Sequence, residues 1–339
     1  AEWIRDHWQS LAAGRSDVTT ELFTACGNCS TQPSVILTVR GWDLPDEVVV
    51  LGAHLDSING SNPYDPNQHA PGADDDASGI ATLTETLRIA LSDGWRPRRT
   101  VKFMGYAAEE VGLRGSNAVA QSFRAGGVNV VSVLQVDMTN YKSGAVTDMK
   151  LISDYSNTDL KNFFVTLFDT YLAPMGLTRS NTACGYACSD HASWTNAGYP
   201  AAMMFEAGDP NGSFRYIHTP YDTLATMGES AQHSVKFTQF ALAYLGETAK
   251  TRGKVTGGPA QVLPALHSLL SQPGHVFWPD DISLLGDRLI AQDRLLTSGQ
   301  LTDTYLLALA VSNGGRLATF DRRLAPDAVK GGKGALHLI

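Results

Sequence analysis

The feature that most constrains this chain is the alternation, over its first 250 residues, of short apolar runs with segments of helical periodicity. A strand that is almost continuously apolar is typically buried on both faces, and helices between such strands favour parallel pairing. We therefore expect an α/β fold with a mostly parallel central sheet and helices on both faces. The expected strands are 34–39, 47–55, 100–108, 130–138 and 199–205, and the expected helices follow Asp76 and occupy 157–172 and 229–248.

A change in composition near residue 250 divides the chain. The segment 251–261 lacks periodicity and is rich in glycine and basic residues, which is typical of a linker. A pattern of alternating helix and strand resumes at residue 262 and runs to the end. We expect a main domain over 1–250, a linker over 251–261 and a small α/β segment over 262–339.

Charge and hydropathy argue against two classes of partner. The formal net charge is −8, so the chain as a whole is not attracted to nucleic-acid phosphates. No apolar run approaches the ~20 residues that a membrane helix needs. We expect neither nucleic acid nor a membrane as a partner of the main domain. The chain opens at Ala1 without an initiator methionine or a signal peptide, so we expect that it is cut from a longer precursor.

Acids and histidines gather where the expected strands end. His54 and Asp137 end two strands, and Glu109 and Glu110 follow a third. Because the carboxyl ends of parallel strands meet at one edge of a sheet, these side chains are expected to lie together. Taken singly, each could be an ordinary polar residue at a strand end or helix start. The set also includes Asp74, Asp75 and Asp76 before a helix, and His218 in the later motif "IHTPYDT".

Buried acids need a compensating charge, and the motifs "GAHLDS", "GADDDASG", "YAAEEVG" and "LQVDMTN" contain no lysine or arginine. Bound cations would supply that charge. Zinc favours histidine nitrogen and carboxylate oxygen, and two zinc ions would balance three carboxylates and one hydroxide. Asp56 is suited to orient the imidazole of His54, and Glu109 is left free as a general base. The expected ligands are His54, one of the central aspartates, Glu110, Asp137 and His218.

The four cysteines form two close pairs, which favours an oxidising compartment. For Cys26 and Cys29, a disulfide and a pair of buried free thiols are equally consistent with the sequence. A zinc ribbon would need a second CxxC pair, but Cys184 and Cys188 are spaced as CxxxC.

Read in order, these motifs, together with "CGYACSDHASW" and "IHTPYDT", resemble the secreted bacterial leucyl aminopeptidases of the di-zinc exopeptidase family, over about residues 1–250. The resemblance implies a zinc metallo-aminopeptidase that releases large hydrophobic, leucine-like residues from the N-termini of peptides or proteins. The implied reaction is attack by a zinc-bridging hydroxide. We also expect a monomer in a secreted, extracellular or periplasmic location. Family members normally begin with further helices, which we expect to be missing before Ala1.

The resemblance also implies a role for each ligand. His54 and Asp137 would hold one zinc ion, and Glu110 and His218 would hold the other. Asp75 would bridge the two ions.

Further roles are implied around the ligands. Glu109 would move the proton, Asp56 would be the partner of His54, and the peptide between Asp75 and Asp76 would be cis. Cys184 and Cys188 would form a disulfide beside the pocket. The residues implied to line the pocket for the first substrate side chain are Met138, Ile152, Tyr186, Met203, Phe205 and Ile217.

The tail, about 262–339, resembles the C-terminal half of PIN-domain ribonuclease toxins. Asp303 and Asp321 match two of the acids that hold Mg²⁺ or Mn²⁺ in that family. Its first strand with an acid and its later glutamate are absent, so we expect an incomplete fold with a vestigial site. Such a toxin acts in the cytoplasm, so the chain is expected to be composite.

Two alternative functions stay open at this point. The tail could act as a Mg²⁺- or Mn²⁺-dependent ribonuclease or as an interaction module. The main part could instead be a non-catalytic binding domain with the peptidase fold. The second alternative would require broken metal ligands, whereas all five expected ligands are present.

Overall fold

The computed structural model describes residues 1–29, 31–63, 65–92, 94–208, 212–249, 278–279, 282–283, 289–294, 300–319 and 324–338. The chain divides into two compact units, Ala1–Arg252 and Gly253–Ile339, which are described separately. The expected linker over 251–261 lies outside the described residues. Within the described part, no helix combines the length and the apolar character that crossing a membrane requires.

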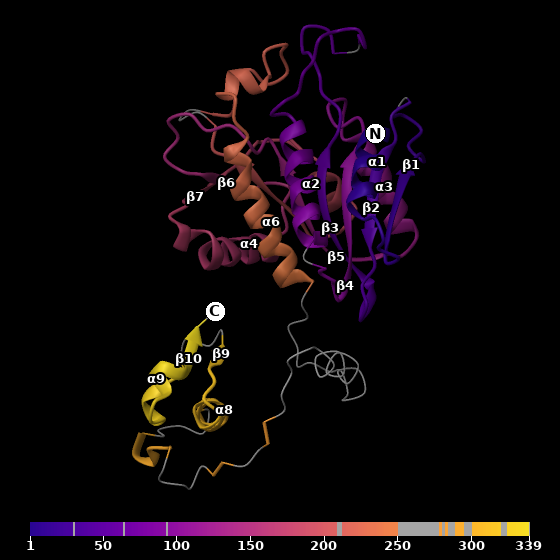
Figure 1. Cartoon of the computed structure of the whole chain (residues 1–339). Helices are drawn as coiled ribbons and strands as arrows, with labels where there is room; N and C mark the ends of the chain where they lie inside the picture. Colours follow the sequence, from indigo (N-terminus) through magenta and orange to yellow (C-terminus); the bar gives the residue numbers. More distant parts are fainter. Residues whose placement is uncertain are drawn as a thin grey trace. The chain divides into compact units, whose positions relative to one another are not determined.

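An eight-stranded sheet with the order β1-β2-β4-β3-β5-β8-β6-β7 forms the centre of the first unit (Figure 1). Strand β3 pairs in parallel with β4 and β5, and β5 pairs in parallel with β8. The pairs β1–β2, β2–β4 and β6–β8 are antiparallel. The strands are β1 (Val18–Phe23), β2 (Ser34–Val39), β3 (Leu44–His54), β4 (Arg99–Tyr106), β5 (Asn129–Asp137), β6 (Met149–Ile152), β7 (Arg179–Thr182) and β8 (Ala201–Glu206).

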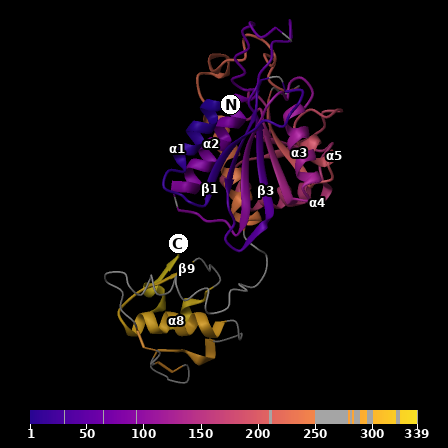
Figure 2. The same ribbon diagram turned by 90° about the vertical axis from the view of Figure 1, so that its right-hand side faces the viewer.

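Helices cover both faces of this sheet, as Figure 2 shows with α1 and α2 on one side and α3 and α5 on the other. One hydrophobic core includes side chains of α1, α2, α4 and α6, and a second includes side chains of α3 and α5. The expected α/β architecture is therefore confirmed. The helices are α1 (Glu2–Leu11), α2 (Ala77–Ser92), α3 (Arg114–Ala125), α4 (Thr158–Tyr171), α5 (His191–Asn196) and α6 (Val235–Thr248), with 3-10 turns η1 (Ala173–Met175), η2 (Leu224–Met227) and η3 (Gln232–Ser234).

The structure differs from the sequence prediction in two respects. Strands β1, β6 and β7 were not predicted, because β1 is a partly exposed edge strand and the other two have only four residues each. The helix predicted over 229–248 begins later, at Val235. Gly228 and Glu229 have φ angles of 87° and 57°, and this left-handed backbone prevents a helix from starting there.

The packing of α4 against α6 depends on an aromatic cluster. The Phe164 ring on α4 meets Phe240 and Tyr244 of α6 edge to face, with ring centroids 5.2 and 5.7 Å apart. All three side chains are fully buried. Edge-to-face aromatic pairs add to the free energy gained from burial, so Phe164 fixes α4 on this face of the sheet.

The second unit has a small core of its own, which includes Ile290, Leu307, Ala308 and Val329. Its strands pair in parallel. Asp303 lies in the first turn of α8, and Asp321 lies outside the described residues, so the predicted two-acid metal site stays a prediction. The described elements are η4 (Gln292–Arg294), α8 (Leu301–Ser312), β9 (Leu317–Thr319), η6 (Pro326–Ala328), α9 (Gly332–Ala335) and β10 (Leu336–Leu338).

We predict that Phe164→Ala lowers the free energy of unfolding by about 3–5 kcal/mol, because it removes a buried ring and leaves a cavity. Phe163→Ala is the matched control, since the neighbouring Phe163 side chain is only partly buried. Urea denaturation followed by circular dichroism measures both variants. Equal losses in the two variants would contradict the role given to Phe164.

Candidate metal centre

The five expected ligands come from strand ends and loops at one edge of the sheet. His54 is the last residue of β3, and Asp137 is the last residue of β5. Glu110 follows β4, Asp75 lies just before α2, and His218 lies in the loop after β8. Because β4, β3 and β5 are parallel neighbours, their carboxyl ends bring side chains that are far apart in the sequence to one place.

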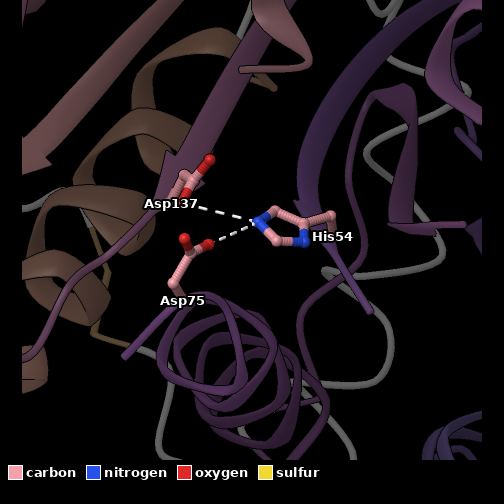
Figure 3. Close-up of side chains that lie close together, drawn as sticks. All are labelled: His54, Asp75 and Asp137. Atoms are coloured by element: carbon pink, nitrogen blue, oxygen red, sulfur yellow. Dashed lines mark hydrogen bonds and ion pairs between the residues drawn. The ribbon is translucent and has the colours of Figure 1, made fainter. Parts of the chain in front are cut away.

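Two ligand groups result, and they share one aspartate. Nε2 of His54 lies 2.8 Å from Oδ1 of Asp75 and 3.7 Å from Oδ1 of Asp137 (Figure 3). Nε2 of His218 lies 3.0 Å from Oδ2 of Asp75 and 2.9 Å from Oε2 of Glu110. Within each group the ligand atoms lie within 4.8 Å of one another. Asp75 thus directs one oxygen to each group, which is the geometry of a bridging carboxylate.

The electrostatics of this site favour positive charge. Hydrogen bonding of the His218 imidazole to the acceptor carboxylates of Asp75 and Glu110 raises the pKa of His218 to about 10. Burial opposes the protonation of His54, yet the carboxylates around it, Asp137 first, raise its pKa well above the usual value. Burial by itself would raise the pKa of Asp75, but its hydrogen bonds with the two histidines lower it. The site is therefore built to hold cationic charge between its carboxylates.

The donor set fits metal ions, and zinc in particular. Two imidazole nitrogens and three carboxylates are ligands that zinc accepts. Neither lysine nor arginine, in the part of the chain that the structure describes, forms an ion pair with these carboxylates. Oε1 of Glu110 is buried and has no hydrogen-bond partner among the described residues, so it is available to a ligand. The residues present therefore fit two divalent ions that share Asp75.

Asp76 has a structural role next to the bridging aspartate. Its Oδ1 accepts hydrogen bonds from the backbone amides of Gly79 (2.9 Å) and Met138 (3.1 Å), and its Oδ2 accepts one from the amide of His54 (3.1 Å). It thus ties the start of α2 to the ends of β3 and β5. The peptide bond between Asp75 and Asp76 is cis, as the family resemblance implied.

Asp74, the first of the three aspartates, pairs with Glu206, an acid that sequence reasoning missed. Burial raises the pKa of Asp74 to about 7 and the pKa of Glu206 well above its usual value, and the neighbouring Asp74 carboxyl group raises the pKa of Glu206 further. Oδ1 of Asp74 accepts from the amide of Asn140 at 3.0 Å. Glu206 accepts from the amides of Tyr141 (2.8 Å) and Phe214 (3.1 Å). This pair supports the loops behind the metal ligands.

Asp56 contacts both sides of the site. Nδ1 of His54 lies 3.0 Å from the backbone oxygen of Asp56 and 3.6 Å from Oδ1 of Asp56. The Asp56 carboxylate accepts hydrogen bonds from the amides of Glu109 (3.0 Å) and Glu110 (3.3 Å). The predicted partner of His54 thus also anchors the turn that carries the predicted base, Glu109, and the predicted ligand, Glu110. Burial raises the pKa of Glu109 well above its usual value.

Two further residues that were not predicted hold the ligands in place. The Asp222 carboxylate accepts hydrogen bonds from the backbone amides of Asp74 (2.8 Å) and Asp75 (3.1 Å), and the side chain is almost fully buried. Ser189 donates a hydrogen bond from Oγ to Oδ2 of Asp137 at 2.6 Å. Asp222 lies in the motif "IHTPYDT" and Ser189 in the motif "CGYACSDHASW". Their position as polar residues within these motifs is the sequence signal that could have identified them.

A pocket of about 460 Å³ adjoins the ligands. Glu109 lines it without belonging to either ligand group. Lys150 also lines the pocket and was not predicted. All six predicted pocket residues line it, namely Met138, Ile152, Tyr186, Met203, Phe205 and Ile217.

Both cysteine pairs are bonded. The Cys184–Cys188 disulfide lies on the pocket wall, as the resemblance implied. The Asp154 carboxylate accepts hydrogen bonds from the amides of Cys184 and Gly185, which anchors this disulfide loop. The second disulfide joins Cys26 and Cys29 and resolves the alternatives that the sequence left open.

Two groups of candidate metal ligands thus share a carboxylate at the edge of a mostly parallel sheet. A family model described as "Peptidase family M28" matches residues 34–243. This match covers well over half of the chain and includes all five ligands. The chain therefore belongs to peptidase family M28.

Individual relatives agree with this assignment. The "Probable leucine aminopeptidase" of Arthroderma otae is 41% identical over 224 residues, which are 63% of this chain and 58% of the relative. A protein of the same name from Arthroderma benhamiae is 36% identical over 249 residues, 71% of this chain and 65% of the relative. The crystal structure of LapB from Legionella pneumophila has a TM-score of 0.65 and 35% identity, covering 74% of this chain and 65% of LapB. The chain thus spans less than two thirds of each relative.

We predict that Asp222→Ala weakens zinc binding by about 10- to 100-fold, because the amides beside the bridging carboxylate lose their acceptor. Asp222→Asn keeps one acceptor oxygen, so its zinc affinity is expected to fall less than that of Asp222→Ala. Competition with a chromophoric chelator measures the affinity. Asp6→Ala, at a largely exposed aspartate of α1, is the control. An unchanged affinity in Asp222→Ala would show that this contact does not position the ligand.

Proposed function

We propose that this protein is a zinc-dependent aminopeptidase that releases the N-terminal residue of peptides. The proposal rests on the position of Asp75. Its carboxylate belongs to both groups of candidate ligands and lines the pocket beside them. The names of the relatives, and the membership of peptidase family M28, support the same activity. All five candidate ligands lie together in the two groups, whereas a non-catalytic binding domain would be expected to have lost some of them.

Zinc ions held by these residues would supply an activated water and a Lewis acid for the scissile carbonyl. Glu109 is placed to take the proton of the attacking water and to deliver it to the leaving amine, since it lines the pocket outside both ligand groups. Asp56 holds the backbone of Glu109 and orients His54. These contacts keep the base and the ligand in a fixed relation.

The pocket supports a preference for large hydrophobic side chains. Most of its predicted wall is apolar, and burial of a leucine side chain against such a wall is worth about 1.5–3 kcal/mol. The carboxylates at the metal end attract the cationic α-amino group of a peptide, which confines cleavage to the first residue. Peptide N-termini are therefore the proposed substrates.

We also propose that the protein works outside the cytoplasm, as a monomer. Two disulfides that use all four cysteines support an oxidising compartment, because thiols are kept reduced in the cytosol. The monomeric state is a hypothesis that sedimentation can test.

We predict that Glu109→Gln keeps its zinc but loses about 10²–10⁴-fold in kcat on leucine p-nitroanilide, because it removes the group that moves the proton. Metal analysis and initial rates on the full chain measure the two effects. Glu85→Gln is the matched control, since Glu85 lies on the surface and pairs with Arg88. Near-normal turnover by Glu109→Gln would refute its assignment as the base.

Removal of the metal is expected to abolish turnover and addition of zinc to restore it. Dialysis against a chelator followed by stepwise addition of zinc tests this with the same substrate. If His54→Ala binds as much zinc as the unaltered protein, the ligand assignment is wrong. If the dialysed protein remains fully active, the metal dependence is wrong.

A further inference from the structure

Lys150 lies within the wall of the pocket. In strand β6, residues 150 and 152 point to the same face, because side chains alternate along a strand. The antiparallel register of β6 with β8 places Lys150 directly opposite Phe205. Ile152 and Phe205 both line the pocket and are expected to contact the substrate side chain. Lys150 is therefore an immediate neighbour of the apolar wall on two sides.

The ammonium group of Lys150 is held at this wall. Its Nζ donates a hydrogen bond to the backbone oxygen of Gly212 at 3.3 Å, and Gly212 also lines the pocket. Among the described lining residues, Lys150 is the one lysine or arginine. The acids among the described lining residues belong to the candidate metal centre or adjoin it: Asp75, Glu109, Glu110 and Asp137. The described part of the wall therefore has acids at one end, at the candidate metal centre, and a cationic side chain, Lys150, at another point.

This arrangement distinguishes side chains by charge as well as by apolar area. A peptide whose α-amino group lies at the metal centre directs its first side chain along Ile152 and Phe205 toward Lys150. The two methylene groups of glutamate can contact the same apolar wall that leucine uses, and its carboxylate can approach the ammonium. A lysine or arginine side chain of the substrate would bring like charges together.

We propose that Lys150 is a specificity-determining residue, which favours N-terminal glutamate and disfavours N-terminal lysine and arginine relative to leucine. This inference rests on the proposed aminopeptidase function and concerns its substrate class. A preference for hydrophobic residues and a preference for negative charge are compatible, because apolar contacts involve Ile152 and Phe205, whereas the charge interaction involves Lys150.

Substitutions at Lys150 test the proposal through ratios of kcat/KM. The substrates are the p-nitroanilides of leucine, glutamate and lysine, which carry no C-terminal carboxylate that could occupy the same place. In Lys150→Met we expect the glutamate-to-leucine ratio to fall about fivefold and the lysine-to-leucine ratio to rise about fivefold, the size of a partly exposed ion pair. Lys150→Arg should keep both ratios within twofold.

Lys161→Met is the matched control. It removes the same charge from the chain, but Lys161 binds the backbone oxygen of Ser153 and does not line the pocket. Both ratios should stay unchanged in this variant. Added salt should lower the glutamate-to-leucine ratio of the unaltered protein and leave that of Lys150→Met unaffected, because screening acts on a charge interaction and not on packing.

Binding measurements separate this proposal from the proposed function. Calorimetry with zinc-loaded protein gives the dissociation constants of the hydroxamates of glutamate and leucine without turnover. The proposal expects their ratio to shift about fivefold in Lys150→Met. If that ratio and the kinetic ratios match those of the unaltered protein, Lys150 does not determine specificity. If leucine p-nitroanilide is not cleaved while the binding ratio shifts, the aminopeptidase function fails and the charge selectivity of the pocket stands.

Discussion

The carboxylates of Asp75, Glu110 and Asp137 face two histidines and no other basic residue of the described chain that could pair with them. This concentration of negative charge is the constraint on which the first unit depends. Buried carboxylates are costly unless a cation balances them. The parallel strands bring these carboxylates together because the strand ends share one edge of the sheet. The fold that forms the pocket therefore also gathers negative charge that a cation would balance.

A second set of acids organises the backbone around the site. Asp56, Asp76 and Asp222 each accept hydrogen bonds from two or more backbone amides at the site. Charge-assisted hydrogen bonds of this kind are stronger than those between neutral groups. The run of three aspartates is thus divided among three roles: Asp75 bridges the ligand groups, while Asp74 and Asp76 fix the segments on either side.

The sequence predicted those features that depend on a short stretch of residues, such as an apolar strand and the polar residue at its end. Long apolar strands that end in His54 or Asp137 could be located, and the convergence of their ends follows from parallel pairing. Which central aspartate faces both groups followed from the family resemblance, since three adjacent acids look alike in a sequence. Lys150 could not be placed, because its position in the pocket depends on the unpredicted pairing of a four-residue strand with β8. Glu206 was missed because its partner, Asp74, lies far away in the chain.

The sharing of Asp75 has a consequence for how the centre is assembled. The Asp75 carboxylate cannot reorient for one ion without changing the oxygen that it offers to a second, so two binding equilibria at this site would be thermodynamically linked. Whichever ion arrives first orders a carboxylate that its neighbour also needs. If two ions bind here, their binding is therefore cooperative, with a coupling free energy, and a titration curve would not decompose into two independent isotherms.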